Sequence, residues 1–191
     1  MDVAWDKGKS LRLDSGEFYL RSLTEDDITP QYIAWMNDPD ILAFINSRNR
    51  KNNYDTIHAY VKRHDNCSNF HLGIFVKETD EHIGNYSIHC DENNKTAITH
   101  VLIGDKNWWG KAVVLKTREM VLSFLFDERN FFKVCGTPLS KNIPAVFNYK
   151  KQGFVVEGIL KNQVLLKDGS RCDVVQFALF RDDFKPVYVQ R

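Results

Sequence analysis

From Val101 to Leu115 the chain reads Val-Leu-Ile-Gly-Asp-Lys-Asn-Trp-Trp-Gly-Lys-Ala-Val-Val-Leu, and this stretch decides the fold. Its first residues favour a strand, its polar middle with two glycines favours a tight loop, and its apolar end favours the first turn of a helix. Amide groups at the start of a helix have no partner within the helix, and with the helix dipole they attract a phosphate group. The stretch therefore predicts a strand, a phosphate-binding loop and a helix.

Length and composition predict one domain over residues 1–191, with a flexible segment at residues 1–10. With 43% hydrophobic and 13% aromatic residues, the chain can bury most of its apolar surface in one core. The 26 lysines and arginines nearly balance 25 aspartates and glutamates, so no net field favours nucleic acid or an anionic membrane as a partner. The start of the chain is polar and no run of about 18 apolar residues follows, so we expect a cytoplasmic protein.

The cysteines of the chain are Cys67, Cys90, Cys135 and Cys172, and they are far apart in the sequence. No pair has the close spacing of a zinc site or a redox motif. We therefore expect reduced thiols and no metal site.

Strand-forming residues gather in segments that alternate with turns and helical patterns. The expected strands are residues 18–23, 70–76, 83–90, 97–103, 131–137, 154–167 and 171–180, the last two joined by the turn Asp168-Gly169. The expected helices follow Thr24-Glu25-Asp26-Asp27, carrying Tyr32, Ile33 and Trp35 inward, and then Asp38-Pro39, residues 55–64, residues 114–126 and the cap Asn142, with Gly153 ending the last.

The order of these elements predicts the fold class. Three consecutive strands with short connections favour antiparallel pairing, whereas the helix between residues 97–103 and 131–137 allows those two strands to lie parallel. We expect an α/β fold of the layered α+β kind, with a mixed, mostly antiparallel central sheet and helices on its faces. On the helix 114–126 the apolar stripe is predicted to face the sheet, with Lys116, Glu119, Ser123 and Asp127 on the opposite side.

Several motifs, weak singly, occur together in an order that is specific. They are Tyr19-Leu20-Arg21-Ser22-Leu23-Thr24-Glu25-Asp26-Asp27, Trp35-Met36-Asn37-Asp38-Pro39, Ile103-Gly104-Asp105 with Trp109-Gly110-Lys111, Tyr149-Lys150-Lys151-Gln152-Gly153-Phe154, Glu157-Gly158 and Asp173-Val174-Val175. In these residues the chain resembles GNAT-type acyl-CoA N-acyltransferases, of the branch that holds ribosomal-protein N-terminal acetyltransferases and amino-sugar acetyltransferases. The resemblance covers nearly the whole chain.

The resemblance implies a site for acetyl-CoA between two splayed parallel strands. The pantetheine arm is expected to pair with the backbone of Leu102, Ile103 and Gly104, and Asn142 resembles an asparagine that contacts the cofactor. The family's phosphate loop falls on Trp109, Gly110, Lys111, Ala112, Val113 and Val114, where Trp109, Ala112 and Val114 depart from the family pattern. The extra bulk crowds a pyrophosphate but removes no amide, so we expect coenzyme A to bind.

The reaction that the resemblance implies is direct attack of an amine on a thioester. Tyr149 stands where the family places a tyrosine acid, and a phenol of pKa about 10 can protonate a thiolate; its alternative role is packing. His100 is the best-placed base, with His71 and His89 as rivals on neighbouring strands. An α-amine of ordinary pKa needs no strong base, so water chains are a further alternative.

For the acceptor, the resemblance favours a small-molecule amine, most of all an amino sugar or a nucleotide-linked amino sugar. Arg48 and Arg50 stand where sugar-acting members keep basic residues, the alternative being an ordinary polar loop. The α-amine of a protein or a drug-like amine is a second hypothesis, and a degenerate, non-catalytic module that binds coenzyme A is a third. We expect a monomer or a homodimer.

Overall fold

The computed structural model describes residues 6–43, residue 45 and residues 51–188, and it contains one eight-stranded sheet. The sheet order is β1-β2-β3-β4-β5-β6-β8-β7, and every neighbouring pair is antiparallel except β5 and β6, which are parallel. The strands are β1 (Arg12–Ser15), β2 (Phe18–Ser22), β3 (Asn69–Val76), β4 (His82–Asp91), β5 (Thr96–Ile103), β6 (Lys133–Gly136), β7 (Val155–Leu165) and β8 (Arg171–Phe180). The predicted fold class is confirmed.

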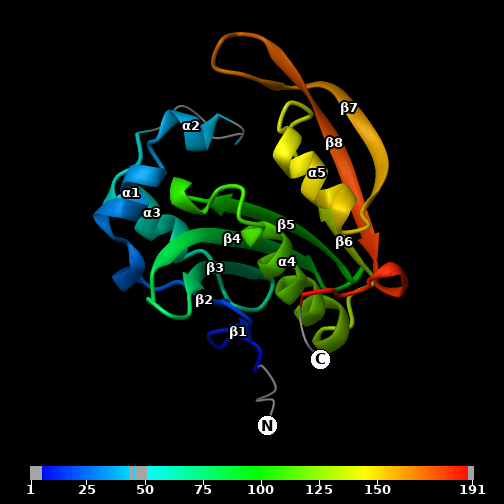
Figure 1. The fold of residues 1–191 in the computed structure, drawn as a ribbon, viewed down its shortest axis with the longest axis horizontal. Helices are drawn as coiled ribbons and strands as arrows, with labels where there is room; N and C mark the ends of the chain where they lie inside the picture. The colour runs from blue at the N-terminus through cyan, green and yellow to red at the C-terminus, as the bar shows by residue number, and fades with distance from the viewer. Residues whose placement is uncertain (1–5, 44, 46–50, 189–191) are drawn as a thin grey trace.

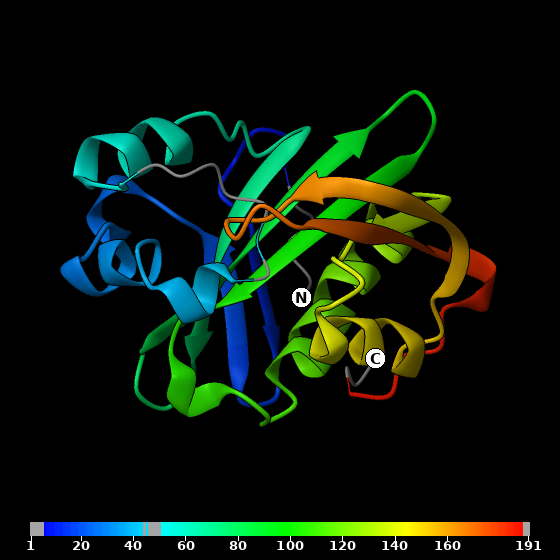
Figure 2. The ribbon, with the colours of Figure 1, turned by 90° about the horizontal axis from the view of Figure 1, so that it is seen from above.

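Helices lie on both faces of this sheet (Figures 1 and 2). They are α1 (Pro30–Trp35), α2 (Pro39–Leu42), α3 (Tyr54–Val61), α4 (Val113–Ser123) and α5 (Ile143–Lys151). Helices α1 to α3 gather beside β2 and β3, whereas α4 packs on the opposite face of the sheet, against β1 and β2, and α5 lies along the long β7–β8 hairpin (Figure 1).

The larger hydrophobic cluster lies between α4 and one face of the sheet. Phe70, Leu72 and Ile74 alternate toward it from β3, and Val121 and Leu122 meet them from α4; all five are fully buried. Burying a side chain of this size contributes roughly 1.5–3 kcal/mol, so this cluster supplies much of the stability of the fold.

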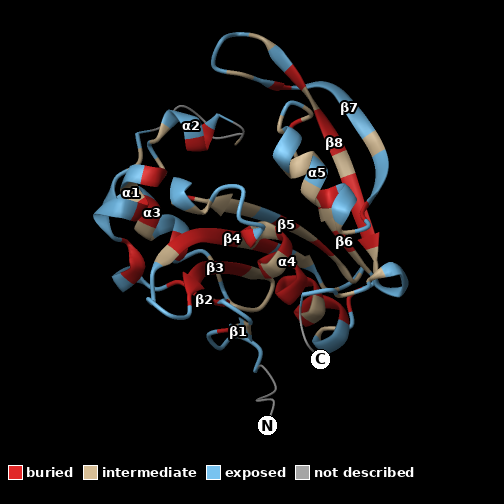
Figure 3. Cartoon of the chain, viewed as in Figure 1, coloured by how far each residue is buried: buried red, intermediate tan, exposed pale blue. Residues whose placement is uncertain are grey.

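A second cluster covers the opposite face of β2 and β3. It joins Tyr19 and Phe75 of these strands to Tyr32 and Trp35 of α1 and to Ile57 of α3. Because both faces of β3 are covered, this strand is buried at nearly every position, whereas the edge strand β7 is exposed at nearly every position (Figure 3). One wall of the cavity described below, lined by Tyr32 and His71, is built on this well-covered part of the sheet.

The parallel pair separates soon after it forms. Thr96–Ile98 of β5 pair with Lys133–Cys135 of β6, after which β6 follows β8 instead. In the described part of the chain no strand pairs with residues 99–103 of β5 on that side. Strand β5 is therefore paired along its whole length on the β4 side and only at its start on the β6 side, which leaves a wedge-shaped gap between β5 and β6.

At the N-terminal end of the chain one strand was not predicted and one helix start was misplaced. The strand β1 has a single apolar residue in Arg12-Leu13-Asp14-Ser15, so the sequence carries little signal for it. Thr24 begins only a short 3-10 helix, Glu25–Asp27, and α1 starts at Pro30 with the Thr29 hydroxyl accepting a hydrogen bond from the Tyr32 amide. Tyr32 and Trp35 are buried as predicted, while Ile33 is half-buried.

The prediction that Glu119 lies on the solvent side of α4 is also wrong. Glu119 is buried, and its carboxylate accepts hydrogen bonds from the amides of Val187 and Tyr188. The C-terminal segment thus returns over α4, which the helical period cannot reveal. Beyond Ser123 the helix widens into a π-helical turn, Phe124–Glu128.

The start of α2 is as predicted, with Asp38 as its cap and Pro39 at its first position. The four cysteines are free thiols, and burial raises the pKa of Cys90 to about 12, which disfavours a nucleophilic role. None of the helices in the described part of the chain is long and apolar enough to span a membrane.

Candidate acyl-CoA and acceptor site

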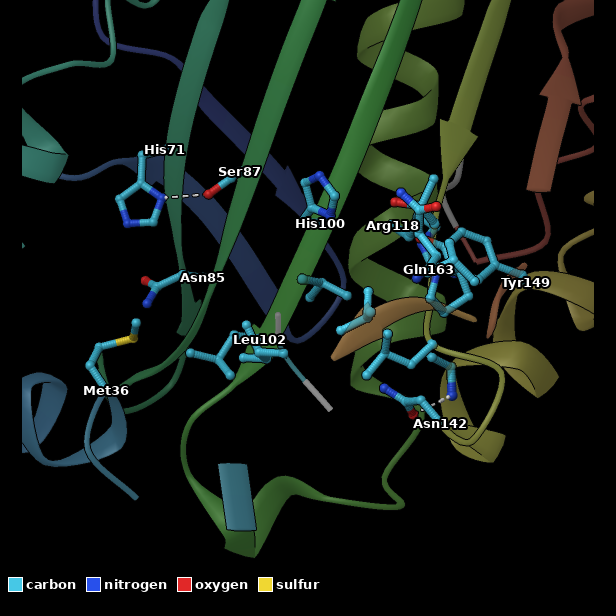
Figure 4. A pocket seen from close by; sticks show the side chains of 18 of the residues that line it. Met36, His71, Asn85, Ser87, His100, Leu102, Arg118, Asn142, Tyr149 and Gln163 are labelled. Carbon is cyan, nitrogen blue, oxygen red and sulfur yellow. Dashed lines mark hydrogen bonds between the residues drawn. The ribbon is translucent and has the colours of Figure 1, made fainter. Parts of the chain in front are cut away.

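A cavity of about 580 Å³ occupies the gap between β5 and β6 (Figure 4). Its walls come from elements that are far apart in the sequence. Among the side chains that line it are Tyr32, His71, Asn85, Ser87, His100, Leu102, Arg118, Asn142, Tyr149 and Gln163. Because the gap passes through the sheet, the cavity is lined both by side chains on the α4 side of β5 and by side chains on the α1–α3 side.

The backbone of β5 turns its amides and carbonyls toward the gap at alternate residues. The Gly104 amide donates to the Ile83 carbonyl over 2.9 Å, and Leu102 pairs with Asn85, so the amide and carbonyl of Leu102 face β4. Those of Val101 and Ile103 face the gap instead. For a pantetheine arm lying in the gap, this register moves the expected contact from Leu102 and Gly104 to Val101, while Ile103 is retained.

Gly104 has a packing role that the sequence did not indicate. A Cβ built on Gly104 would lie 2.1 Å from the Trp35 ring, so only glycine permits α1 to approach β5 this closely. The Trp109 indole N–H donates to the Ile103 carbonyl over 3.0 Å, which ties the loop to the end of β5. Trp109 therefore holds the start of the phosphate loop against the strand.

The predicted phosphate loop turns sharply into α4. Gly110 has φ +76° and Ala112, the N-cap residue, has φ +59° in the left-handed region that favours glycine. The first bond of the helix runs from the Lys116 amide to the Ala112 carbonyl over 3.2 Å, so the amides of Val113 and Val114 point out of the helix start. The loop has the form of an anion-binding helix start.

The lysines near this loop differ in their contacts. Lys106 forms ion pairs with Asp38 and Asp40, each at 2.8 Å. Lys111 lies over the Trp108 ring at 5.0 Å, and this contact leaves its ammonium group beside the loop. Of the two, Lys111 is the better placed to meet a phosphate.

Tyr149 reaches the narrow end of the gap from α5 and is only 4% exposed. Its ring stacks on Phe177 with centroids 5.0 Å apart, and the guanidinium of Arg118 lies 4.0 Å from its centroid. The hydroxyl donates a long hydrogen bond of 3.4 Å to the Thr99 carbonyl. A Cβ on Gly136 would lie 2.2 Å from this hydroxyl, so β6 leaves room for the phenol only because residue 136 is glycine.

Asn142 caps α5, as predicted. Its side-chain oxygen accepts a hydrogen bond from the Ala145 amide over 3.1 Å, and the residue also lines the cavity (Figure 4). Its amide nitrogen is the group that remains for a ligand, because the oxygen is used by the cap.

The three candidate bases lie in different surroundings. His100 projects from β5 at the cavity, and its pKa is lowered because its charged form loses hydration there and is repelled by His89. His89 hydrogen-bonds Asn69 over 2.7 Å and is not among the residues that line the cavity. His100 is therefore neutral at pH 7 and opens to the cavity, as a general base must.

His71 is buried and hydrogen-bonded at both ring nitrogens. Nε2 lies 2.9 Å from the Tyr32 hydroxyl, and Nδ1 lies 3.1 Å from both the Tyr86 carbonyl and the Ser87 hydroxyl. Burial and the neighbouring His64 lower the pKa of His71 to about 3. Ser87 is bonded in turn to the Tyr60 hydroxyl at 3.0 Å, so a polar chain crosses this wall of the cavity.

Arg48 and Arg50, the predicted acceptor-binding residues, lie outside the described residues. Conversely, Tyr32, Asn85 and Ser87 line the cavity and were not predicted as site residues. The alternation Asn85, Ser87, His89 along β4 places polar side chains on one face of a strand, and this period of two was the available signal.

A splayed parallel pair, a strand backbone that faces the gap and a helix start with free amides are together the features of a fold that binds acyl-coenzyme A. The acetyltransferase (GNAT) domain family matches residues 17–155, and the chain belongs to this family, whose members use acetyl-CoA. The chain is 27% identical to an uncharacterised N-acetyltransferase, p20, of Bacillus licheniformis over 115 residues. That match spans 59% of this chain and 63% of the length of the relative.

Solved structures show the same fold at low identity. Spermidine N-acetyltransferase from Vibrio cholerae, solved with CoA and spermine, has a TM-score of 0.79 and 18% identity, covering 87% of this chain and 97% of that one. Ribosomal-protein-S5-alanine acetyltransferase from Vibrio fischeri has a TM-score of 0.78 and 16% identity, covering 92% and 100%. At such identities the likeness concerns the fold.

Proposed function

We propose that this protein transfers the acetyl group of acetyl-CoA to a primary amine by direct attack within one ternary complex. The observation that carries the proposal is a single cavity in the gap of the sheet, lined by both Tyr149 and His100. Holding two reactants in such a site can supply roughly 7–11 kcal/mol of the barrier, so no covalent enzyme intermediate is required.

The residues of the gap fit the cofactor. The unpaired amides of Val113 and Val114 and the side chain of Lys111 would hold the pyrophosphate. The backbone of Val101 and the amide of Ile103 would pair with the pantetheine arm, and the Asn142 amide nitrogen would contact it beside α5. When bound, acetyl-CoA supplies the acetyl group as a reactive thioester.

Two side chains would move the protons. His100, neutral at pH 7, takes a proton from the attacking amine while the new carbon–nitrogen bond forms. Tyr149 gives its hydroxyl proton to the sulfur as the carbon–sulfur bond breaks, and its hydrogen bond of 3.4 Å to the Thr99 carbonyl is weak enough to exchange. The proton taken by His100 then returns through water to the Tyr149 phenolate, which restores both side chains for the next turnover.

For the acceptor we propose an amino sugar or a nucleotide-linked amino sugar. None of the described residues that line the cavity carries a carboxylate, whereas a polyamine such as spermidine is a multiple cation. A sugar amine needs neutral partners for its hydroxyl groups, and Asn85, Ser87 and Gln163 supply them. Arg48 and Arg50 are proposed to meet the diphosphate of a linked nucleotide.

The test combines binding with turnover. Calorimetry should give one site for acetyl-CoA per chain, and ligand at 100 times its dissociation constant should stabilise the fold by about 2.7 kcal/mol. Thiol release is then followed with amino sugars, nucleotide-linked amino sugars, peptides and polyamines. No heat and no thermal shift at millimolar acetyl-CoA would contradict the proposal.

Two alternatives have their own signatures in this test. Faster turnover of a peptide α-amine than of any sugar would favour a protein N-terminal acetyltransferase; the Vibrio fischeri structure of the same fold is named as a ribosomal-protein-S5-alanine acetyltransferase. Binding of acetyl-CoA without turnover of any amine would favour a non-catalytic module, and the left-handed Ala112 in the phosphate loop is the observation behind that alternative.

A further inference from the structure

We propose that the acceptor carries an oxygen atom on the carbon adjacent to the one that bears its amine, and that the Asn85 side-chain amide donates a hydrogen bond to this oxygen. The inference rests on the proposed acetyl transfer and deepens it, since it names the chemical group that the acceptor side of the cavity selects. It excludes simple alkyl amines and polyamines as preferred acceptors.

The orientation of the Asn85 amide is fixed by its neighbours. His82 Nε2 lies 3.0 Å from the Gly84 carbonyl and 2.8 Å from Asn85 Oδ1. A carbonyl only accepts, so Nε2 must carry the proton, and the atom of Asn85 that faces it must be the oxygen. The NH₂ group of Asn85 is therefore the end that remains for another partner.

That NH₂ group has no hydrogen-bond partner among the described residues, although Asn85 is only 4% exposed and lines the cavity. Buried polar groups in folded proteins nearly always have a partner, and an isolated one marks a place where a ligand supplies it. Because an NH₂ group can only donate, the atom it meets must be an acceptor, such as a hydroxyl or carbonyl oxygen.

Tyr32, beside this donor, is fixed in the opposite sense. The Tyr86 carbonyl accepts from His71 Nδ1, so the Nδ1–H tautomer leaves Nε2 bare, and the Tyr32 hydroxyl must donate to it. The lone pairs of the Tyr32 oxygen are then available to an amine N–H. The Tyr32 ring also packs edge-on against His82, with centroids 5.6 Å apart, so the two fixed groups share one neighbourhood.

This wall of the cavity thus offers a donor at Asn85 and an acceptor at Tyr32, with no carboxylate among the described lining residues. The complementary fragment is an amine N–H with an oxygen close to it. A 2-amino sugar has this arrangement in its vicinal hydroxyl, whereas the nitrogens of a polyamine are separated by methylene groups only.

The test uses a pair of amines that differ in one hydroxyl, trans-2-aminocyclohexanol and cyclohexylamine, with spermidine as the third acceptor. In the parent protein we expect kcat/KM, expressed per concentration of unprotonated amine, to be about tenfold or more higher for the amino alcohol than for cyclohexylamine, since one buried hydrogen bond is lost in the latter. This measurement involves no substitution, so folding cannot obscure it.

The matching variant is Asn85→Leu. Leucine removes the free NH₂ group and brings no donor, acceptor or charge, and His82 Nε2 keeps the Gly84 carbonyl as its partner, so the preference for the amino alcohol should collapse while spermidine turnover changes little. The dissociation constant of acetyl-CoA should stay within about twofold, which also reports that the variant is folded. Equal kcat/KM for the two cyclic amines in the parent, or a preference that survives in Asn85→Leu, would overturn the inference.

Calorimetry of the two amines separates this proposal from the proposed function. If acetyl-CoA binds but both amines bind with equal or undetectable affinity, the acceptor inference fails and acetyl transfer to another amine stands. If acetyl-CoA does not bind, the transfer function fails, and tighter binding of the amino alcohol than of cyclohexylamine still decides for Asn85.

Discussion

The two sides of the proposed site offer different kinds of groups to a ligand. On the α4 side, the groups proposed to meet the cofactor are mostly backbone amides and carbonyls, those of Val101 and Ile103 in β5 and those at the start of α4. On the α1–α3 side, the polar groups are side chains, among them Tyr32 and Asn85, held by other side chains. A substitution therefore removes or changes a recognition group directly on the α1–α3 side. On the α4 side it leaves the backbone groups in place and can act only by straining or displacing them.

Tyr149 lies where the two sides meet, and its loss should have the largest effect. Tyr149→Phe keeps the ring on Phe177 and removes only the hydroxyl, so kcat should fall by about 10²–10⁴-fold while acetyl-CoA affinity changes little. Stopped-flow turnover and calorimetry measure the two quantities. The matched control is Tyr86→Phe, which loses a hydroxyl bonded to Thr117 behind the sheet and should keep kcat within a few-fold. Equal losses in the two variants would return Tyr149 to a packing role.

Gly136→Ala tests the same position from the strand side. The new Cβ would lie 2.2 Å from the Tyr149 ring, so we expect overpacking to cost about 1–3 kcal/mol and kcat to fall because the phenol is displaced. The control is Gly158→Ala, whose Cβ meets only the flexible end of Gln176 at 3.2 Å. Thermal unfolding and turnover of both variants give the comparison. An unchanged kcat in Gly136→Ala would show that the position of the phenol is not critical.

The same contrast explains what could be predicted from the sequence. The strand, loop and helix of the cofactor side are contiguous, and local propensity and the Asn142 cap predicted them with the right boundaries to within a few residues. The acceptor side brings together α1, β3 and β4, so Asn85 and Tyr32 meet only in the tertiary structure.

Misplaced elements have equally physical causes. Thr24 and Thr29 both precede acceptable helix starts, and the Pro30 that decides between them was not weighed. Glu119 fits a solvent-facing position by period, but amides of Val187 and Tyr188, far along the chain, satisfy its carboxylate in the interior. Local pattern cannot indicate a partner of this kind.

His71 allows the α1–α3 side of the cavity to be tested through the pH dependence of stability. Its folded pKa of about 3 lies below the unfolded value of about 6.5, so the unfolded chain takes up the proton first as pH falls. The stability from neutral His71 is complete above pH 6.5 and is lost between 6.5 and 3. Between pH 7.5 and 5.0 this group should account for about 2 kcal/mol.

The measurement is urea unfolding at both pH values for the parent and for His71→Gln. His64, His82 and His100 also have lowered pKa values and remain in the variant. The free energy of unfolding should therefore fall more steeply with falling pH in the parent than in His71→Gln, and the difference between the two slopes is the contribution of His71. Equal m-values confirm that the two unfolding reactions expose similar surface. Identical pH dependence in the two proteins would mean that His71 is not held neutral in the fold.

The smallest effect on stability is expected on the α4 side of the cavity, at Ala112. A φ of +59° costs a residue with a Cβ roughly 1–2 kcal/mol, and glycine would remove this cost. Glycine also gives the unfolded chain more conformational freedom, which offsets part of the gain. Ala112→Gly should therefore raise the free energy of unfolding by about 0.5–1 kcal/mol. Val114→Gly, two residues later inside α4, should lower it by up to about 1 kcal/mol.

Both variants keep every amide of the helix start, so backbone recognition predicts that acetyl-CoA binds each of them at least as tightly as the parent, with less bulk near the pyrophosphate. Thermal unfolding without ligand separates the two stabilities, and calorimetry gives the affinities. Weaker binding in a folded Ala112→Gly variant would show that the methyl group holds the loop in its binding form, and the cofactor side would then depend on side chains as the acceptor side does.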